Sequence, residues 1–361
     1  MPGKGRASNL RRLPRSAIIA ASRLHAREER KGALRSMAGS RDVAAKTIRF
    51  ENPGRLAYEF PEPYGSDFAG TGMSPSPDDR PPNGPDEWGA IWRNIGVCRL
   101  GEVQEFPLED WRDFDRLAIP AIRDPKRWES VKGARERAGE RFLIGGGISI
   151  YERVHFIRGL HNTWTDVYAE PDNLGRLIDI LVDMNLVAIE HYAAEDVDGY
   201  MFCDDWGLQN SLMIPPDAWR AIWKPRYARI YAAAHDAGML TLLHSCGYIV
   251  DILDDLIEAG LDVIQMDQQE NMGLERLGRA FGGRIAFWCP VDIQNTMARG
   301  NPEEIRAYCR RMVACLGRPE GGFLARWYGD PVGAGHTQEA IDAMCDEFLK
   351  ISAEMAAAAC G

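Results

Sequence analysis

The 361-residue sequence lacks a hydrophobic run that could span a membrane: its apolar stretch at 16–24 is far shorter than the roughly 18 residues that a span needs. It also lacks closely spaced cysteines, since its eight cysteines are scattered, which argues against a small disulfide-stapled domain. Apolar residues make up 45% and charged residues 27% of the chain, which excludes wholesale disorder. These features predict a soluble, cytoplasmic, globular protein with reduced thiols.

Acidic charge dominates the chain but is unevenly spread. The net charge is −10, yet residues 1–36 carry ten Lys or Arg against Glu28 and Glu29, a local charge of +8. The remainder therefore carries −18, which repels nucleic-acid phosphates and predicts no nucleic-acid partner. The basic head could be an arm for an anionic surface or a targeting segment; alternatively, natural translation starts at Met37. We treat residues 1–40 as a disordered extension or a mis-called start.

The folded part divides into two regions by pattern. Residues 41–140 are irregular, with Pro and Gly clustered at 75–85, and we interpret them as an N-terminal elaboration packed on the main domain. From residue 141 to 361, short apolar runs alternate with helix-period stretches, which predicts strand–helix units on a parallel sheet. The expected strands are 141–147, 200–205, 241–246, 262–267, 285–289 and 323–327, and the clearest helices are 174–195, 249–258 and 302–315.

Chemically capable residues follow these apolar runs, whereas no G-x-G-x-x-G motif does. An open doubly wound sheet would call for such a motif at its dinucleotide site, whereas a closed (β/α)8 barrel gathers its functional residues at the carboxyl ends of its strands. We therefore predict a (β/α)8 TIM barrel over 141–361, with one mouth lined by Asp204, Asp205, His244, Cys246, Asp267, Cys289, Asp292 and Arg326.

His244 and Cys246 form the sharpest motif. Two positions apart in extended backbone, an imidazole and a thiolate can face one centre, and this pair of ligands suits Zn²⁺. The alternative is a buried histidine beside an inert thiol. No spacing rule selects a third ligand, for which the candidates are Cys289, Asp330 and His336.

Carboxylates and aromatic residues near the same strand ends are further site candidates. Asp204 and Asp205 leave one strand together, so one should face the mouth while the other meets backbone amides. We assign possible catalytic roles to Asp204, Asp205 and Glu152, although capping the following loop would explain a strand-end carboxylate as well. Candidates for substrate binding, with core packing as the alternative for the aromatic residues, are Tyr64, Trp206, Trp288, Trp327 and Asp292.

Several of these segments together resemble the uroporphyrinogen decarboxylase superfamily over about residues 45–350. The segments that carry the resemblance are Cys203-Asp-Asp-Trp-Gly207, Ile214-Pro-Pro-Asp217, Trp223-Lys-Pro-Arg-Tyr227 and Leu243-His-Ser-Cys-Gly247. The resemblance implies a (β/α)8 barrel and a superfamily that also includes cobalamin-dependent methyltransferases.

Two departures from the family pattern bear on function. The Arg-Gln-Ala-Gly-Arg segment with which true decarboxylases pair porphyrin propionates is missing, which disfavours porphyrinogen decarboxylation. The methyltransferases hold zinc with H-x-C and a later cysteine; His244 and Cys246 match the pair, but Arg326-Trp-Tyr-Gly-Asp330 stands where the cysteine is expected. The resemblance therefore implies a zinc site completed by another ligand, with Asp330, Glu152 and Cys289 as candidates.

The reaction implied by the resemblance is methyl transfer between a small methylated substrate, here an aromatic methyl ether, and the cobalt of a corrinoid. The sequence has no D-x-H-x-x-G motif for binding cobalamin, so a separate corrinoid protein would supply it. A decarboxylase acting on a carboxylated ring is the alternative enzyme, and a non-catalytic barrel that binds a corrinoid or a partner is the third hypothesis. The resemblance also suggests a homodimer.

Overall fold

The structure, a computed structural model, describes residues 39–94, 96 and 101–359. Ser40–Gly361 forms one compact unit. The basic head that we set apart at residues 1–40 lies almost wholly outside the described residues, so its nature stays a prediction.

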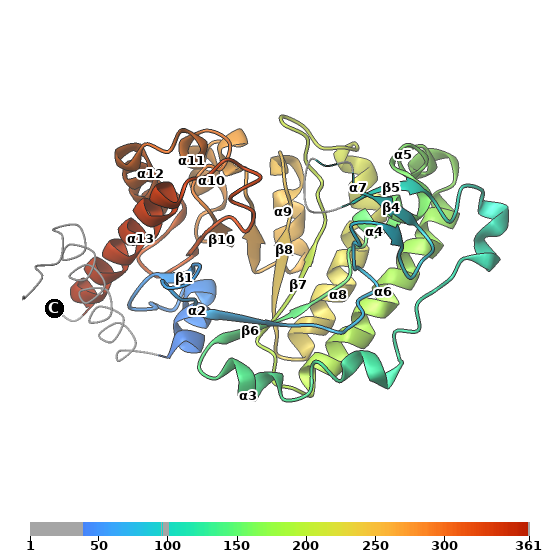
Figure 1. The fold of residues 1–361 in the computed structure, drawn as a ribbon, viewed down its shortest axis with the longest axis horizontal. Coiled ribbons are helices and arrows are strands. Elements are labelled where there is room, and N and C mark those ends of the chain that lie inside the picture. Colours follow the sequence, from blue (N-terminus) through green and yellow to red (C-terminus); the bar gives the residue numbers. More distant parts are fainter. Residues whose placement is uncertain (1–38, 95, 97–100, 360–361) are drawn as a thin grey trace, which may run out of the picture. The chain divides into compact units, whose positions relative to one another are not determined.

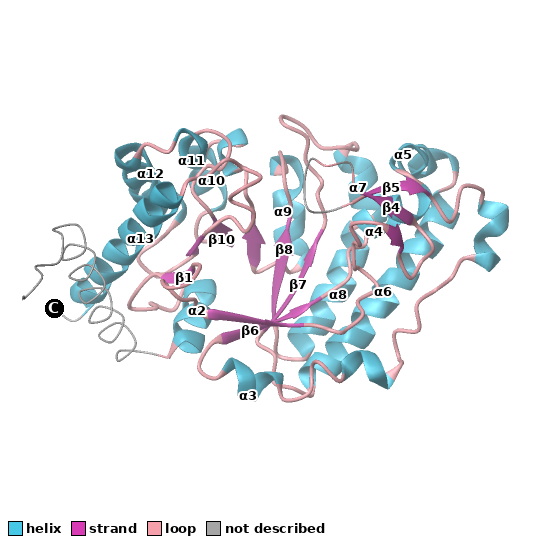
Figure 2. Cartoon of the chain, viewed as in Figure 1, coloured by secondary structure: helices cyan, strands magenta, loops and turns pink. Residues whose placement is uncertain are grey.

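The centre of this unit is an eight-stranded, all-parallel sheet with the order β1-β11-β10-β9-β8-β7-β6-β2. It curls into a nearly closed barrel, with the helices gathered around the strands (Figures 1 and 2). The strands are β1 (Ala57–Glu59), β2 (Phe68–Thr71), β6 (Phe142–Gly146), β7 (Gly199–Cys203), β8 (Leu240–His244), β9 (Val263–Gln265), β10 (Ala286–Cys289) and β11 (Phe323–Arg326). The predicted (β/α)8 TIM barrel is confirmed, and all six strands expected from the sequence are present.

Helices follow the strands as the periodicity indicated. The expected helices appear as α6 (Pro171–Ala193), α9 (Val250–Ala259) and α12 (Pro302–Leu316), and Asn301 caps α12 by accepting the N–H groups of Glu303 and Glu304. The others are α2 (Ser40–Arg49), α3 (Ala134–Ala138), α4 (Glu152–Arg158), α5 (Leu160–Ala169), α7 (Pro216–Ile222), α8 (Lys224–Asp236), α10 (Leu274–Phe281), α11 (Thr296–Arg299) and α13 (Gln338–Ala359), with short 3-10 turns at η1 (Trp111–Arg116), η2 (Pro125–Trp128) and η3 (Gln269–Asn271). Within the described ranges we find no helix long and apolar enough to cross a bilayer.

The boundary that we placed at residue 140 needs correction. Two of the eight barrel strands, β1 and β2, come from the segment 41–140 that we interpreted as an elaboration outside the barrel. These strands have only three and four residues, too few to show a hydrophobic pattern in the sequence. The same segment also contributes a small antiparallel sheet of β3 (Gly84–Pro85), β4 (Ile91–Arg93) and β5 (Glu102–Glu105), which does elaborate the barrel.

Aromatic rings from opposite sides of the sheet meet inside the barrel. The rings of Phe68 on β2 and Trp288 on β10 lie 4.8 Å apart, although these strands are not neighbours, so both side chains point inward. Side chains in register on adjacent parallel strands share a face, and Trp288 is in register with Gln265, which is in register with His244. His244 in turn is in register with Cys203. These four residues therefore form one inward-facing layer near the carboxyl end of the barrel.

Candidate functional site

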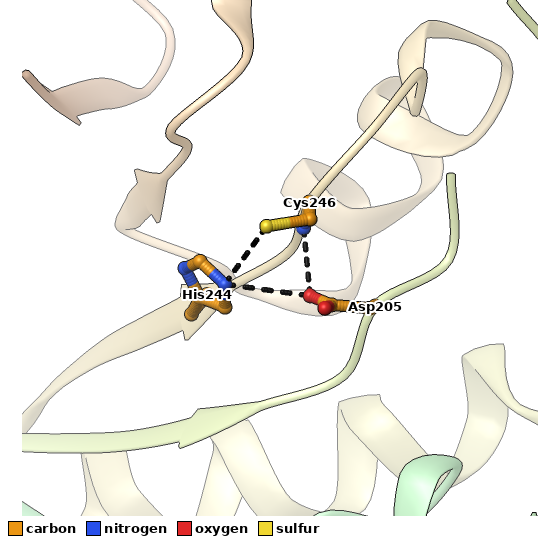
Figure 3. Close-up of side chains that lie close together, drawn as sticks. All are labelled: Asp205, His244 and Cys246. Atoms are coloured by element: carbon orange, nitrogen blue, oxygen red, sulfur yellow. Dashed lines mark hydrogen bonds and ion pairs between the residues drawn. The ribbon is translucent and has the colours of Figure 1, made fainter. Parts of the chain in front are cut away.

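Three side chains at the carboxyl ends of β7 and β8 form a possible metal site (Figure 3). The Nε2 atom of His244 lies 3.3 Å from Cys246 Sγ and 3.4 Å from Asp205 Oδ1. One ligand atom of each residue lies within 4.8 Å of the other two, and no second group of three His, Cys, Asp or Glu side chains meets this condition in the described part of the chain. One nitrogen, one sulfur and one oxygen ligand suit Zn²⁺, with a fourth position left for water or substrate.

Backbone contacts between two loops bring the three ligands together. The N–H of Cys246 donates to Asp205 Oδ1 at 2.8 Å, and the N–H of Gly207 donates to the carbonyl of Cys246 at 3.1 Å. A Cβ atom at Gly207 would collide with the backbone of Gly247 and Tyr248, so glycine is required where the loops cross. This close approach explains why Gly207 follows the Asp204–Asp205 pair and why Gly247 follows Cys246.

A second layer of hydrogen bonds orients His244. Its Nδ1 atom is bonded to Gln265 Oε1, and Gln265 Nε2 donates to Asp267 Oδ1 at 2.7 Å. Because Asp267 accepts from the amide nitrogen, the amide oxygen of Gln265 faces the imidazole, and Nδ1 must carry the proton. The other ring nitrogen, Nε2, therefore faces Cys246 and Asp205, the side on which a metal ion would bind.

Glu152, at the start of α4, is a buried acid next to this site. Burial and, to a smaller extent, the charge of Asp205 raise its pKa to about 7, although Arg80 opposes both effects. Arg80 holds the carboxylate through two hydrogen bonds of 3.2 and 2.9 Å. A carboxyl group with this pKa can donate or accept a proton near neutral pH. Sequence reasoning selected Glu152 but missed Arg80, which lies in the Pro- and Gly-rich loop.

Asp204 and Asp205 diverge as expected, and the structure shows which faces which way. Asp204 is fully buried and accepts hydrogen bonds from the N–H groups of Tyr151 at 2.8 Å and Glu152 at 2.9 Å, from that of Ile150 at 3.2 Å, and from the Tyr227 hydroxyl at 2.6 Å. It therefore caps the start of α4 and positions Glu152. The catalytic role that we assigned to Asp204 needs correction, because its oxygens are occupied by these donors.

We expect Asp204→Ala to lower the free energy of unfolding by about 3 to 5 kcal/mol, since four buried donors would lose their acceptor. Urea denaturation followed by circular dichroism measures this change. The matched control is Asn301→Ala, which removes an exposed cap and should cost about 1 kcal/mol. A loss for Asp204→Ala no larger than that of the control would contradict the capping role.

None of the four residues proposed as third ligand joins the His–Cys pair in the described part of the chain; they are Cys289, Asp330, Glu152 and His336. Cys289 is fully buried on β10, where burial raises the pKa of its thiol, and Asp330 accepts from the N–H of Gly333 in the loop after β11. Neither belongs to the group of possible ligands, in which Asp205 takes the third place. His336 has its Nε2 atom 2.9 Å from the carbonyl oxygen of Ile293.

Most of the predicted substrate-binding residues have structural contacts. Trp206 is fully buried, stacks on Tyr151 at 3.8 Å and donates to the Tyr227 hydroxyl, so it lies in the core and not at a pocket wall. Tyr64 donates its hydroxyl hydrogen to Asp342 of α13, and Asp292 accepts from the backbone and hydroxyl of Thr296 at the start of α11. Trp288 points into the barrel and Trp327, just after β11, is partly buried against the core, so these two remain substrate-binding candidates.

The fold and this site define a (β/α)8 barrel whose polar residues converge at the carboxyl ends of the strands, where enzymes of this architecture bind substrate. The sequence model of the uroporphyrinogen decarboxylase (URO-D) family matches residues 101–345. The chain therefore belongs to the uroporphyrinogen decarboxylase family.

Two known proteins are similar to this chain in sequence or in fold. A uroporphyrinogen decarboxylase from Nocardia farcinica is 25% identical over 226 residues, which cover 60% of this chain and 61% of that protein. A solved methyltransferase from Methanosarcina mazei is 17% identical, with a TM-score of 0.58 over 74% of this chain and 77% of the other. At that identity the likeness shows the fold, so the choice between reactions depends on the residues of the site.

Proposed function

We propose that this protein is a corrinoid-linked methyltransferase that removes the methyl group of an aromatic methyl ether and passes it to the cobalt of a separate corrinoid protein. The single observation that carries the proposal is the grouping of Asp205, His244 and Cys246 at the barrel mouth. These residues would hold Zn²⁺, which supplies Lewis-acid activation of an ether oxygen when it is bound.

The chain's own groups supply the remaining requirements. Cleavage of an aryl methyl ether leaves the bonding electron pair on oxygen, while the methyl group passes to the electron-rich cobalt of the partner's corrinoid. The oxygen must then gain a proton or another source of positive charge. Glu152 can donate that proton, because its raised pKa keeps it protonated up to about pH 7, and Arg80 fixes the position of its carboxyl group.

Positioning of the metal ligands follows from their neighbours. Gln265 and Asp267 hold the Nδ1 side of His244, so that its Nε2 atom is directed at the site, and the Cys246 N–H holds Asp205 in place. Together these contacts fix the site before any ligand arrives, which lowers the reorganisation that a transition state would require.

The test is a methyl-transfer assay with the full chain, free cob(I)alamin as acceptor and a panel of methoxyarenes as donors. We expect formation of methylcobalamin, seen in the absorption spectrum, together with one demethylated phenol for each methyl group moved. Parallel incubations with carboxylated aromatic rings measure release of CO₂. Methyl transfer from no donor, or CO₂ release without methyl transfer, would overturn the proposal, the latter in favour of a decarboxylase.

A further inference from the structure

Arg326, the last residue of β11, carries hydrogen-bond donors that the protein does not use. It lies two residues after Leu324, which is in register with the inward-facing Trp288, so by alternation Arg326 also faces the barrel interior. Its guanidinium carbon lies 4.9 Å from the centre of the Trp288 ring. Its one ion-pair partner among the described residues is Glu59, whose Oε2 atom is 3.5 Å from the Arg326 Nε atom, too far for a good hydrogen bond.

Other buried or partly buried arginines of this chain form hydrogen bonds with carboxylates. Arg80 makes two hydrogen bonds to Glu152, and Arg55 makes two to Asp67. The side chain of Arg326 makes no hydrogen bond to any described residue, although it is only 23% exposed. A guanidinium has five N–H donors, and leaving them unpaired at a partly desolvated position is unfavourable unless a ligand takes them.

The contacts of Arg326 leave its outer edge free. Trp288 supports one face of the guanidinium plane, and Glu59 lies beside Nε, so the two terminal nitrogens remain for a ligand. Those two nitrogens form a planar fork that matches the two oxygens of a carboxylate. Burial raises the pKa of Glu59, with Arg326 opposing the effect, so this carboxyl group is a weaker competitor for the guanidinium than an ordinary glutamate.

Arg326 faces the same mouth as the proposed metal ligands. Strands β8 and β11 are separated by β9 and β10, and neighbouring strands lie about 4.8 Å apart. By register, Leu324 shares the layer of Trp288, Gln265 and His244, so Arg326, two residues further on, lies one layer nearer the carboxyl end, where Asp205 and Cys246 follow their strands. A molecule held at one end by Arg326 would thus present its other end to His244 and its neighbours.

We propose that Arg326 binds a carboxylate of the methyl donor, which makes the substrate a methoxylated aromatic acid. The inference rests on the proposed function and names the substrate class for the same site. The charged end of the substrate would sit on Arg326, supported by Trp288, and its methoxy group would reach the metal ligands on the opposite side of the mouth.

Binding is measured without any corrinoid, by titration calorimetry of 4-methoxybenzoate and of uncharged methoxybenzene. We expect the wild type to bind the acid more tightly than the neutral ether, and Arg326→Gln to weaken binding of the acid roughly 10- to 100-fold while leaving the neutral ether unchanged. Arg326→Lys keeps the charge but loses the fork, so its affinity should fall between the two. The matched control is Arg229→Gln, which removes a half-exposed surface arginine paired with Asp183.

Equal binding of the acid by the wild type and Arg326→Gln would overturn the inference and would mean that Arg326 only balances the charge of Glu59. Equal affinity of the wild type for acid and neutral ether would overturn it as well. If the acid binds through Arg326 but no methyl group moves in the cob(I)alamin assay, the carboxylate site stands and the proposed methyl transfer fails. Thermal unfolding of each variant establishes that it is folded.

Discussion

Protein in which alanine replaces His244 should retain less than a tenth of the zinc that the wild type binds, measured by elemental analysis after dialysis against a weak chelator. Loss of a residue that merely orients a ligand reduces metal affinity by roughly 10- to 100-fold, so removing the ligand itself should cost more. Methyl transfer should fall by at least roughly 100-fold for the same reason. Asp205→Asn and Cys246→Ser should behave alike, because the three ligand atoms form one group.

Two controls separate this ligand set from the one that sequence reasoning favoured. Asp330→Asn and Cys289→Ala should keep the wild-type zinc content, because neither residue lies with His244 and Cys246. If Asp330→Asn or Cys289→Ala lost zinc while Asp205→Asn kept it, Asp205 would not be the third ligand. Zinc content that is equally low in the wild type and His244→Ala would remove the metal from the mechanism.

Local spacing made the His–Cys pair predictable, whereas the third ligand depends on contacts between distant segments. His244 and Cys246 come from one strand and its loop, so alternation alone places them on one side. Asp205 follows a different strand, and only the crossing of the two loops at Gly207 brings it within reach. The sequence showed that two adjacent carboxylates must diverge, but not which one meets the helix amides.

A similar limit explains why the sequence did not distinguish the core residue Trp206 from the inward-facing Trp288. The alternation rule holds along a strand and ends where the strand ends, so it could not show that Trp206, three residues beyond β7, turns into the core. Trp288 lies within β10, and there the rule holds. The contact of Arg80 with Glu152 could not be predicted for another reason. Arg80 lies in an irregular loop, and nothing in its spacing relates it to Glu152, 72 residues away.

Glu152→Gln should slow methyl transfer from an ordinary methoxyarene by roughly 100- to 10,000-fold, the range expected for loss of a general acid. Donors whose phenol product is strongly acidic need less help from a proton and should be affected least. Binding of the donor should change little, because the substitution keeps the size of the side chain and one of its two oxygens for Arg80. Single-turnover rates with cob(I)alamin, measured for both kinds of donor, test this pattern.

The pH dependence gives a sharper test, because it depends on which form of Glu152 works. Burial first, and then Asp205, raise its pKa to about 7, so the acid form is present below that pH and is lost as the pH rises through it. The wild-type rate should therefore be highest below about pH 7 and fall tenfold per pH unit above it. The rate of Glu152→Gln should lack this falling limb of the pH profile. Arg80→Met removes the charge that lowers this pKa and should shift the falling limb to higher pH. A limb that persists in Glu152→Gln, or that Arg80→Met leaves unmoved, would assign the proton to another group.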